Sequence, residues 1–190
     1  MHGFIIRGIE LFLRTRHGDR IWAEVSAASG LDRRGAQMIR SYPSEAATRL
    51  IRSASTVLQI SPDELLEDIG GWIPRQENIR HIMRFSGSCF EDFVLSLDDL
   101  HDRGRVILPG LDLPRIETHV TALHCYQLKI AAEDISWNPV LAGFLRGMAD
   151  DYGVLAIVDS NDSCLNVCIA DESFAEGSQF SLTELTWNAS

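Results

Sequence analysis

The stretch SCFEDFVLSLDDLHDRGRVILPGLDLPRIETHVTA, residues 88–122, contains the change of pattern that decides the fold class. In its first part, apolar side chains from Phe90 and Phe93 onward recur at the spacing of one helix face, which His101 continues. A connection rich in Pro and Gly follows, and from Arg115 the residues are typical of a β-strand. The sequence therefore predicts a helical half followed by a sheet, with His101 pointing into the core.

Helices are also predicted throughout the residues that precede this stretch. Apolar residues recur at helical spacing within 4–13 and again from Ile21, and Gly30 can end the second helix. Ser44 can cap a third helix, whose apolar face continues to Leu58.

Two capping boxes mark further helix starts. Ser61–Glu64 is the first, with Pro62 at the first helical position, and Gly70–Gly71 is expected to end the helix that it opens. Ser88–Glu91 is the second, and it is expected to begin the helix of the opening stretch.

The second half of the chain predicts a small antiparallel sheet with one helix. Asn138 can cap that helix, Gly153 can end it, and Asn161–Asp162 is the expected turn of a hairpin. The predicted strands are residues 115–123, 124–131, 154–160 and 164–170. We therefore expect an α+β fold, in which an N-terminal helical subdomain precedes a small antiparallel sheet with one packed helix.

Composition excludes several classes of protein. The 190 residues carry a formal charge of -10, and their arginines are scattered, so no clustered positive surface for nucleic acid is expected. The start has Arg7, Glu10 and Arg14 among its apolar residues and no cleavage site, which argues against a signal peptide. No apolar run is long enough for a membrane span. We expect a soluble, cytoplasmic protein.

No sequence motif points to an enzyme. The Gly-x-Ser-x-Gly, phosphate-loop and His-Glu-x-x-His patterns are absent from the sequence, and Cys89 has no obvious paired base. Cys164 and Cys168 share a strand face about 13 Å apart, too far for one zinc ion or for a disulfide between them. Cys125, on another strand, could meet one of them. Buried, inert thiols are the favoured interpretation, and we expect no enzyme.

His101 has two interpretations from the residues alone. Its imidazole could offer one nitrogen to iron or zinc while a backbone carbonyl holds the other, or it could be a hydrogen-bonded core histidine. Periodicity alone favours the second.

Residues 93–103, FVLSLDDLHDR, followed by Pro109–Gly110 and Pro114, resemble the haem-ligand helix and loop of the haem nitric oxide/oxygen binding (H-NOX) domains. These are bacterial relatives of the haem domain of soluble guanylate cyclase. His101 and Pro114 keep the family's interval of thirteen residues between its proximal histidine and the proline that presses on the porphyrin. The likeness extends over almost the whole chain. It implies one sensor domain over residues 1–180 and a tail over 181–190.

The resemblance also implies a haem site. His101 would be the axial ligand of a haem b iron, and Pro114 would contact the porphyrin. The residues in register with the family's gas-binding side are Ile5, Trp72, Val140 and Phe144. None of them has a hydroxyl group to hold bound oxygen, so the resemblance implies a preference for nitric oxide.

One departure concerns the haem propionates. Relatives carry Tyr-x-Ser-x-Arg before the distal helix, whereas this chain has Ile130, Ala132 and Asp134 at those places. An arginine elsewhere in the chain, such as Arg84 or Arg103, would have to replace the missing donors. The departure leaves two interpretations open: haem binding with differently paired propionates, or a haem-free module that binds another apolar ligand or only another protein.

The mechanism implied by the resemblance is a switch. Nitric oxide breaks the bond between His101 and iron, and the two halves of the domain rotate. The signal would pass to a separate protein, such as a histidine kinase or a cyclic-di-nucleotide enzyme, with no nucleic acid or membrane partner. The third alternative is an enzyme that uses Cys89 or a cysteine-based redox site.

Overall fold

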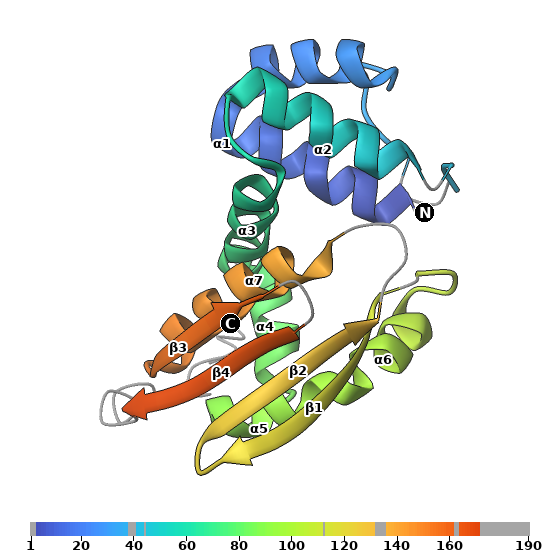
Figure 1. Cartoon of the computed structure of the whole chain (residues 1–190). Coiled ribbons are helices and arrows are strands. Elements are labelled where there is room, and N and C mark those ends of the chain that lie inside the picture. The colour runs from blue at the N-terminus through green and yellow to red at the C-terminus, as the bar shows by residue number, and fades with distance from the viewer. Residues whose placement is uncertain are drawn as a thin grey trace, which may run out of the picture.

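The computed structural model describes residues 3–37, 41–43, 45–111, 113–131, 136–161 and 164–171. Figure 1 shows a helical lobe at the top and a lower part in which helices pack on a sheet. The helices are α1 (Gly3–Ser29), α2 (Glu45–Leu58), α3 (Pro62–Trp72), α4 (Glu77–Arg84), α5 (Phe90–Leu95), α6 (Leu100–Ile107) and α7 (Trp137–Tyr152), with 3₁₀ turns η1 (Ile73–Arg75) and η2 (Ser96–Asp99). The strands are β1 (Arg115–Ala122), β2 (Cys125–Ala131), β3 (Leu155–Ser160) and β4 (Cys164–Asp171). The predicted α+β class is confirmed.

The helical lobe is built from α1 and α2. Helix α1 bends at Gly18, whose φ of 85° is readily adopted only by glycine, so the two helices predicted there are two arms of one element. Gly30 follows the second arm with a φ of 75°, as predicted for a helix end. Ser44, the predicted cap of α2, lies outside the described residues.

Helices α3 and α7 cross at unusually close range because glycines line their contact. A Cβ atom added to Gly70 would lie 1.9 Å from the carbonyl oxygen of Val140, and one added to Gly143 would lie 2.0 Å from that of Glu67. The prediction that Gly70–Gly71 ends α3 was therefore wrong, because these glycines serve helix packing and α3 continues to Trp72. The capping box at its start is confirmed, since the amide of Glu64 donates to Ser61 Oγ over 3.1 Å.

Two other helix starts differ from the prediction by one or two residues. Cys89, rather than Ser88, is the N-cap of α5, and its sulfur accepts from the amide of Asp92. Ser136, rather than Asn138, is the N-cap of α7. The Asn138 side chain instead donates to the carbonyl of Asn161 over 2.9 Å, and so connects the start of α7 to the residue that follows β3. The helix predicted to lead to His101 is also interrupted by η2, so His101 lies on the separate helix α6.

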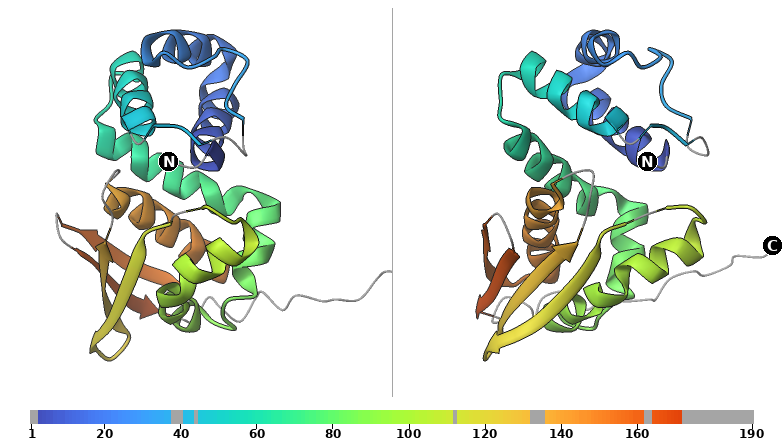
Figure 2. Two further views of the ribbon diagram at one scale, coloured as in Figure 1. Left: turned by 90° about the vertical axis from the view of Figure 1, so that its right-hand side faces the viewer. Right: turned by 45° about the vertical axis from the view of Figure 1, so that its right-hand side comes forward.

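The sheet has four antiparallel strands in the order β1-β2-β4-β3. Figure 2 shows α7 lying against one face of this sheet. Side chains on that face form the core of the lower part with α5 and α7, among them Ile116, Tyr126, Leu128, Val158, Leu165 and Val167. Ile73 and Trp137 contact this cluster and the core of the helical lobe, and so join the two parts.

The outer face of the sheet carries a disulfide between Cys125 and Cys168. The two residues lie directly opposite each other on β2 and β4, with 4.2 Å between their Cα atoms. The interpretation of Cys168 as an inert thiol was therefore wrong, because pairing across strands depends on the register, which spacing along one strand cannot reveal. Cys164 is a buried free thiol, and Cys89 is an exposed one.

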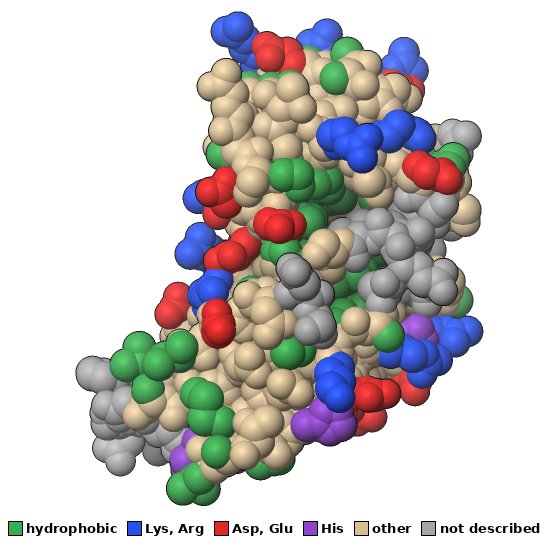
Figure 3. Space-filling model, in the orientation of Figure 1, with side chains coloured by type: hydrophobic (Ala, Val, Ile, Leu, Met, Phe, Trp, Pro, Cys, Tyr) green, Lys and Arg blue, Asp and Glu red, His purple; other side chains and the backbone are tan. Residues whose placement is uncertain are grey.

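In the described part of the chain, every helix falls short of the length or apolarity needed to cross a lipid bilayer. Figure 3 shows arginine and acidic side chains interspersed over the face it presents, and a hollow with apolar side chains between the helical lobe and the lower part.

Candidate functional site

His101 is held on α6 in one ring orientation. The residue is 6% exposed, and its Nδ1–H donates to the carbonyl oxygen of Leu113 over 2.6 Å. A carbonyl can only accept, so the proton resides on Nδ1 and the lone pair on Nε2, which is itself buried. A backbone carbonyl that fixes the tautomer in this way is a common support for a metal-binding imidazole.

The connection after α6 folds back against the helix that carries His101. Gly104 gives the end of the Leu113 side chain room, because a Cβ atom there would lie 2.7 Å from Leu113 Cδ1. The fold-back brings the Leu113 carbonyl to His101 and leaves Pro114 buried directly after it. The two residues predicted as iron ligand and porphyrin contact are thus linked through one hydrogen bond and one peptide unit.

Arg103 anchors the same helix to the α4–α5 region. Its guanidinium donates to Ser86 Oγ over 2.7 Å and to the carbonyl of Ser96 over 2.8 Å. These contacts engage both terminal nitrogens of Arg103 and leave only its buried Nε without a partner, so the side chain is held toward Ser86 and Ser96.

Arg84 is also engaged elsewhere. It pairs with Asp151 over 3.5 Å and lies over the ring of Tyr152, with 4.2 Å from Cζ to the centroid. Burial raises the pKa of Tyr152, and Arg84 partly offsets this effect. Arg84 therefore contributes to the lower core and is not poised as a propionate donor either.

Three of the four predicted distal residues come together. Trp72 and Val140 are buried members of the helical-lobe core, and Ile5 packs against that core. Phe144, one turn after Val140 on α7, belongs instead to the lower core, where its ring lies 5.9 Å from that of Phe93. The predicted distal side chains are thus divided between the core of the helical lobe and the core of the lower part, and α7 contributes one of them to each core.

The first of the three positions expected to bind a haem propionate has no side-chain hydrogen-bond donor. Ile130 lies opposite Ile116 in the sheet and packs on the lower core, while the neighbouring Lys129 is exposed on the outer face. Ala132 and Asp134 lie outside the described residues. The described residues therefore offer haem iron one buried, oriented imidazole, and they lack the expected donor at the first propionate position.

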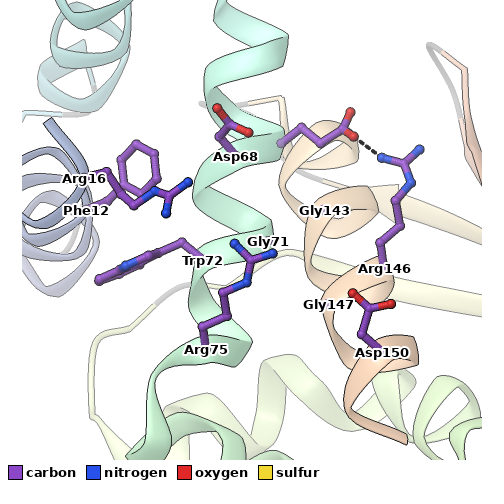
Figure 4. Close-up of a pocket in the computed structure, with 11 residues that line it drawn as sticks. Phe12, Arg16, Asp68, Gly71, Trp72, Arg75, Gly143, Arg146, Gly147 and Asp150 are labelled. Carbon is purple, nitrogen blue, oxygen red and sulfur yellow. Dashed lines mark hydrogen bonds and ion pairs between the residues drawn. The ribbon is translucent and has the colours of Figure 1, made fainter. Parts of the chain in front are cut away.

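Two cavities are formed by described residues away from His101. One, of about 170 Å³, lies between α1, α3 and α7 and is drawn in Figure 4. The other, of about 190 Å³, lies between α2, α3 and Ser136 at the start of α7.

The sequence and the whole fold were compared with known proteins. A family model described as Haem-NO-binding matches residues 2–155. The chain belongs to the Haem-NO-binding family. This family, also called H-NOX, binds haem, and its members bind diatomic gases.

Solved H-NOX structures share the fold at low sequence identity. An H-NOX protein from S. oneidensis in the Fe(II)NO ligation state superposes with a TM-score of 0.78 at 15% identity, covering 90% of this chain and 100% of that one. An oxygen-binding H-NOX domain related to soluble guanylate cyclases, solved as the oxygen complex, gives 0.72 at 15% identity, covering 90% and 96%.

A curated relative is the soluble guanylate cyclase gcy-31 of Caenorhabditis elegans. It is 28% identical over 117 residues, which cover 60% of this chain and 17% of the relative. The matched stretch is therefore about a sixth of that relative's length.

Sequence reasoning overlooked the roles of two charged side chains. Glu10 is a fully buried carboxylate on α1, and the pattern of Arg7 and Arg14 at i−3 and i+4 was the signal that could have revealed it. The anchoring role of Arg103 had no local signal, because Ser86 and Ser96 lie on other elements.

Proposed function

We propose that the chain is a haem-based sensor of nitric oxide that signals to a separate protein through α6. The observation that carries the proposal is the buried imidazole of His101, which the Leu113 carbonyl holds with Nε2 as its lone-pair nitrogen. A buried histidine of the core would also need an acceptor for its N–H, and in an axial ligand the same bond directs Nε2 toward the metal.

The predicted distal side chains support nitric oxide as the preferred gas. When bound, haem would supply an iron that His101 Nε2 would hold and that would bind a diatomic gas, and nitric oxide binding would loosen the hold of His101. Ile5, Val140 and Phe144 are apolar, and the indole N–H of Trp72 is the single hydrogen-bond donor among the four side chains. Bound oxygen carries negative charge and needs a donor, whereas nitric oxide needs none.

Release of His101 would act on α6, the helix that carries it. Arg103 transfers any shift of this helix to Ser86 and Ser96 through its two hydrogen bonds. At the end of α6, Val106 and Ile107 are 84% and 69% exposed. Exposed apolar side chains of this kind suit a surface to which a partner protein binds. The proposed partner is a histidine kinase or a cyclic-di-nucleotide enzyme.

The test is an absorption spectrum of the protein after haem reconstitution. We expect a Soret band in the unaltered chain, a displaced or lost band in His101→Ala, and recovery when imidazole is added. The matched control is His119→Ala, because His119 is an exposed histidine on β1 and its loss should leave the spectrum unchanged. Absence of a Soret band, or an identical band in His101→Ala, would refute the proposal.

A second candidate is a haem-free module. It is favoured by Ile130 at the first propionate place and by the engagement of Arg84 and Arg103 elsewhere. It predicts colourless protein after reconstitution, and native mass spectrometry would then detect an apolar ligand or none.

A further inference from the structure

The cavity between α1, α3 and α7 lies away from His101 and has a lining of its own. Figure 4 shows Arg16 entering from α1, Arg75 from η1 after α3, and Asp150 from α7. The cavity therefore lies where the helical lobe meets the rest of the molecule. Its volume is about 170 Å³.

One ion pair at the rim is already complete. Arg146 pairs with Glu67 across the cavity and also donates to the carbonyl of Val158 over 2.8 Å. These two side chains therefore close the α3–α7 edge and leave no net charge for a ligand.

The remaining charged side chains of the lining have no such partners. Among the described residues, Arg16 and Arg75 make no ion pair or hydrogen bond through their guanidinium groups, and the same holds for the carboxylates of Asp68 and Asp150. Two cations and two anions, all on exposed residues, thus line one half-open pocket. A simple anion would meet the two aspartates, and a simple cation would meet the two arginines, whereas a molecule with both charges can satisfy both sets.

The uncharged part of the cavity lining, two aromatic rings and three glycines, suits a short apolar group. The rings of Phe12 and Trp72 meet edge to face with 5.9 Å between their centroids, and both line the cavity. The floor is formed by Gly71, Gly143 and Gly147, which place no side chain in the space.

We propose that this cavity binds a small zwitterion of the amino-acid class. Its carboxylate pairs with Arg16 and Arg75, its ammonium group pairs with Asp68 or Asp150, and its side chain lies against Trp72. Because Arg16 belongs to the helical lobe and Asp150 to α7, such a ligand bridges two parts of the molecule. The proposal does not depend on haem.

The test is calorimetric titration of the full chain with L-leucine, beside two probes that each keep one charge, 4-methylpentanoate and 3-methylbutylamine. We expect saturable binding of L-leucine and at least tenfold weaker binding of either probe. Arg16→Ala and Arg75→Ala should each weaken binding of L-leucine at least tenfold. Arg49→Ala is the matched control, because this exposed arginine of α2 lies outside the cavity.

A second variant tests the floor of the cavity. A Cβ atom on Gly71 would come no closer than 3.6 Å to the Gly143 carbonyl oxygen, so Gly71→Ala should fold and place a methyl group in the space. We expect it to weaken binding with an unchanged circular dichroism spectrum. No saturable binding, equal binding of a single-charge probe, or unchanged affinity in Arg16→Ala and Arg75→Ala would overturn the proposal.

Discussion

Glu10 is a fully buried carboxylate that fixes a loop to α1. Its Oε1 accepts from Arg14 Nε over 2.9 Å and pairs with Arg7, and its Oε2 accepts from the amide of Ala36 over 2.7 Å. Gly35 lies so close that a Cβ atom there would be 2.3 Å from Oε1, and its φ of 108° also favours glycine. The residues after α1 are therefore held against the helix that carries Ile5.

Replacing Glu10 tests this arrangement at the level of one residue. Glu10→Ala leaves the Ala36 amide without its acceptor and removes a buried partner from two arginines, so we expect a loss of about 3 kcal/mol in unfolding free energy. The measurement is urea unfolding followed by circular dichroism. Glu24→Ala, which removes an exposed pair with Arg20, should cost about 0.5 kcal/mol. Equal losses in both variants would contradict the role given to Glu10.

At the level of elements, the crossing of α3 and α7 determines how the two parts of the molecule join. The close approach of backbone to backbone at Gly70 and Gly143 leaves no room for any side chain there. The same approach places the predicted distal residues Trp72 and Val140 in one cluster. Local sequence gave the wrong interpretation at Gly70, because glycine serves both as a helix end and as a close contact.

Two alanine substitutions at this crossing should have opposite effects. Gly143→Ala should lower the unfolding free energy by about 2 kcal/mol, because the helices must separate to admit the methyl group. Gly71→Ala should keep or raise stability by up to about 1 kcal/mol, since it gains helix propensity without a clash. Thermal unfolding of both variants provides the comparison, and a stabilised Gly143→Ala would show that the helices are not in close contact.

At the scale of the whole molecule, the Cys125–Cys168 disulfide closes a large loop. The two cysteines are 43 positions apart, and the loop contains α7 and β3. Such a bond constrains the unfolded chain more than the folded one, because the folded sheet already brings the two strands together.

Reduction of this bond should therefore weaken the fold without changing its secondary structure. We expect the unfolding free energy to fall by about 4 kcal/mol in the presence of a thiol reductant. Cys125→Ser should be insensitive to the reductant, whereas Cys89→Ser, which removes an exposed free thiol, should respond like the unaltered chain. A reductant effect that persists in Cys125→Ser would rule out this disulfide as the cause.

The sequence by itself determined that helices precede a four-stranded sheet with one helix, the inward direction of His101 and the capping box at Ser61, because periodicity and capping act within a few residues. Its resemblance to H-NOX domains also indicated the family. Only the tertiary structure decided the support of His101 by Leu113, the engagement of Arg103, the cysteine pair and the charged cavity at Arg16 and Arg75. These features join residues from different elements, so they depend on register and helix crossing, which no local pattern encodes.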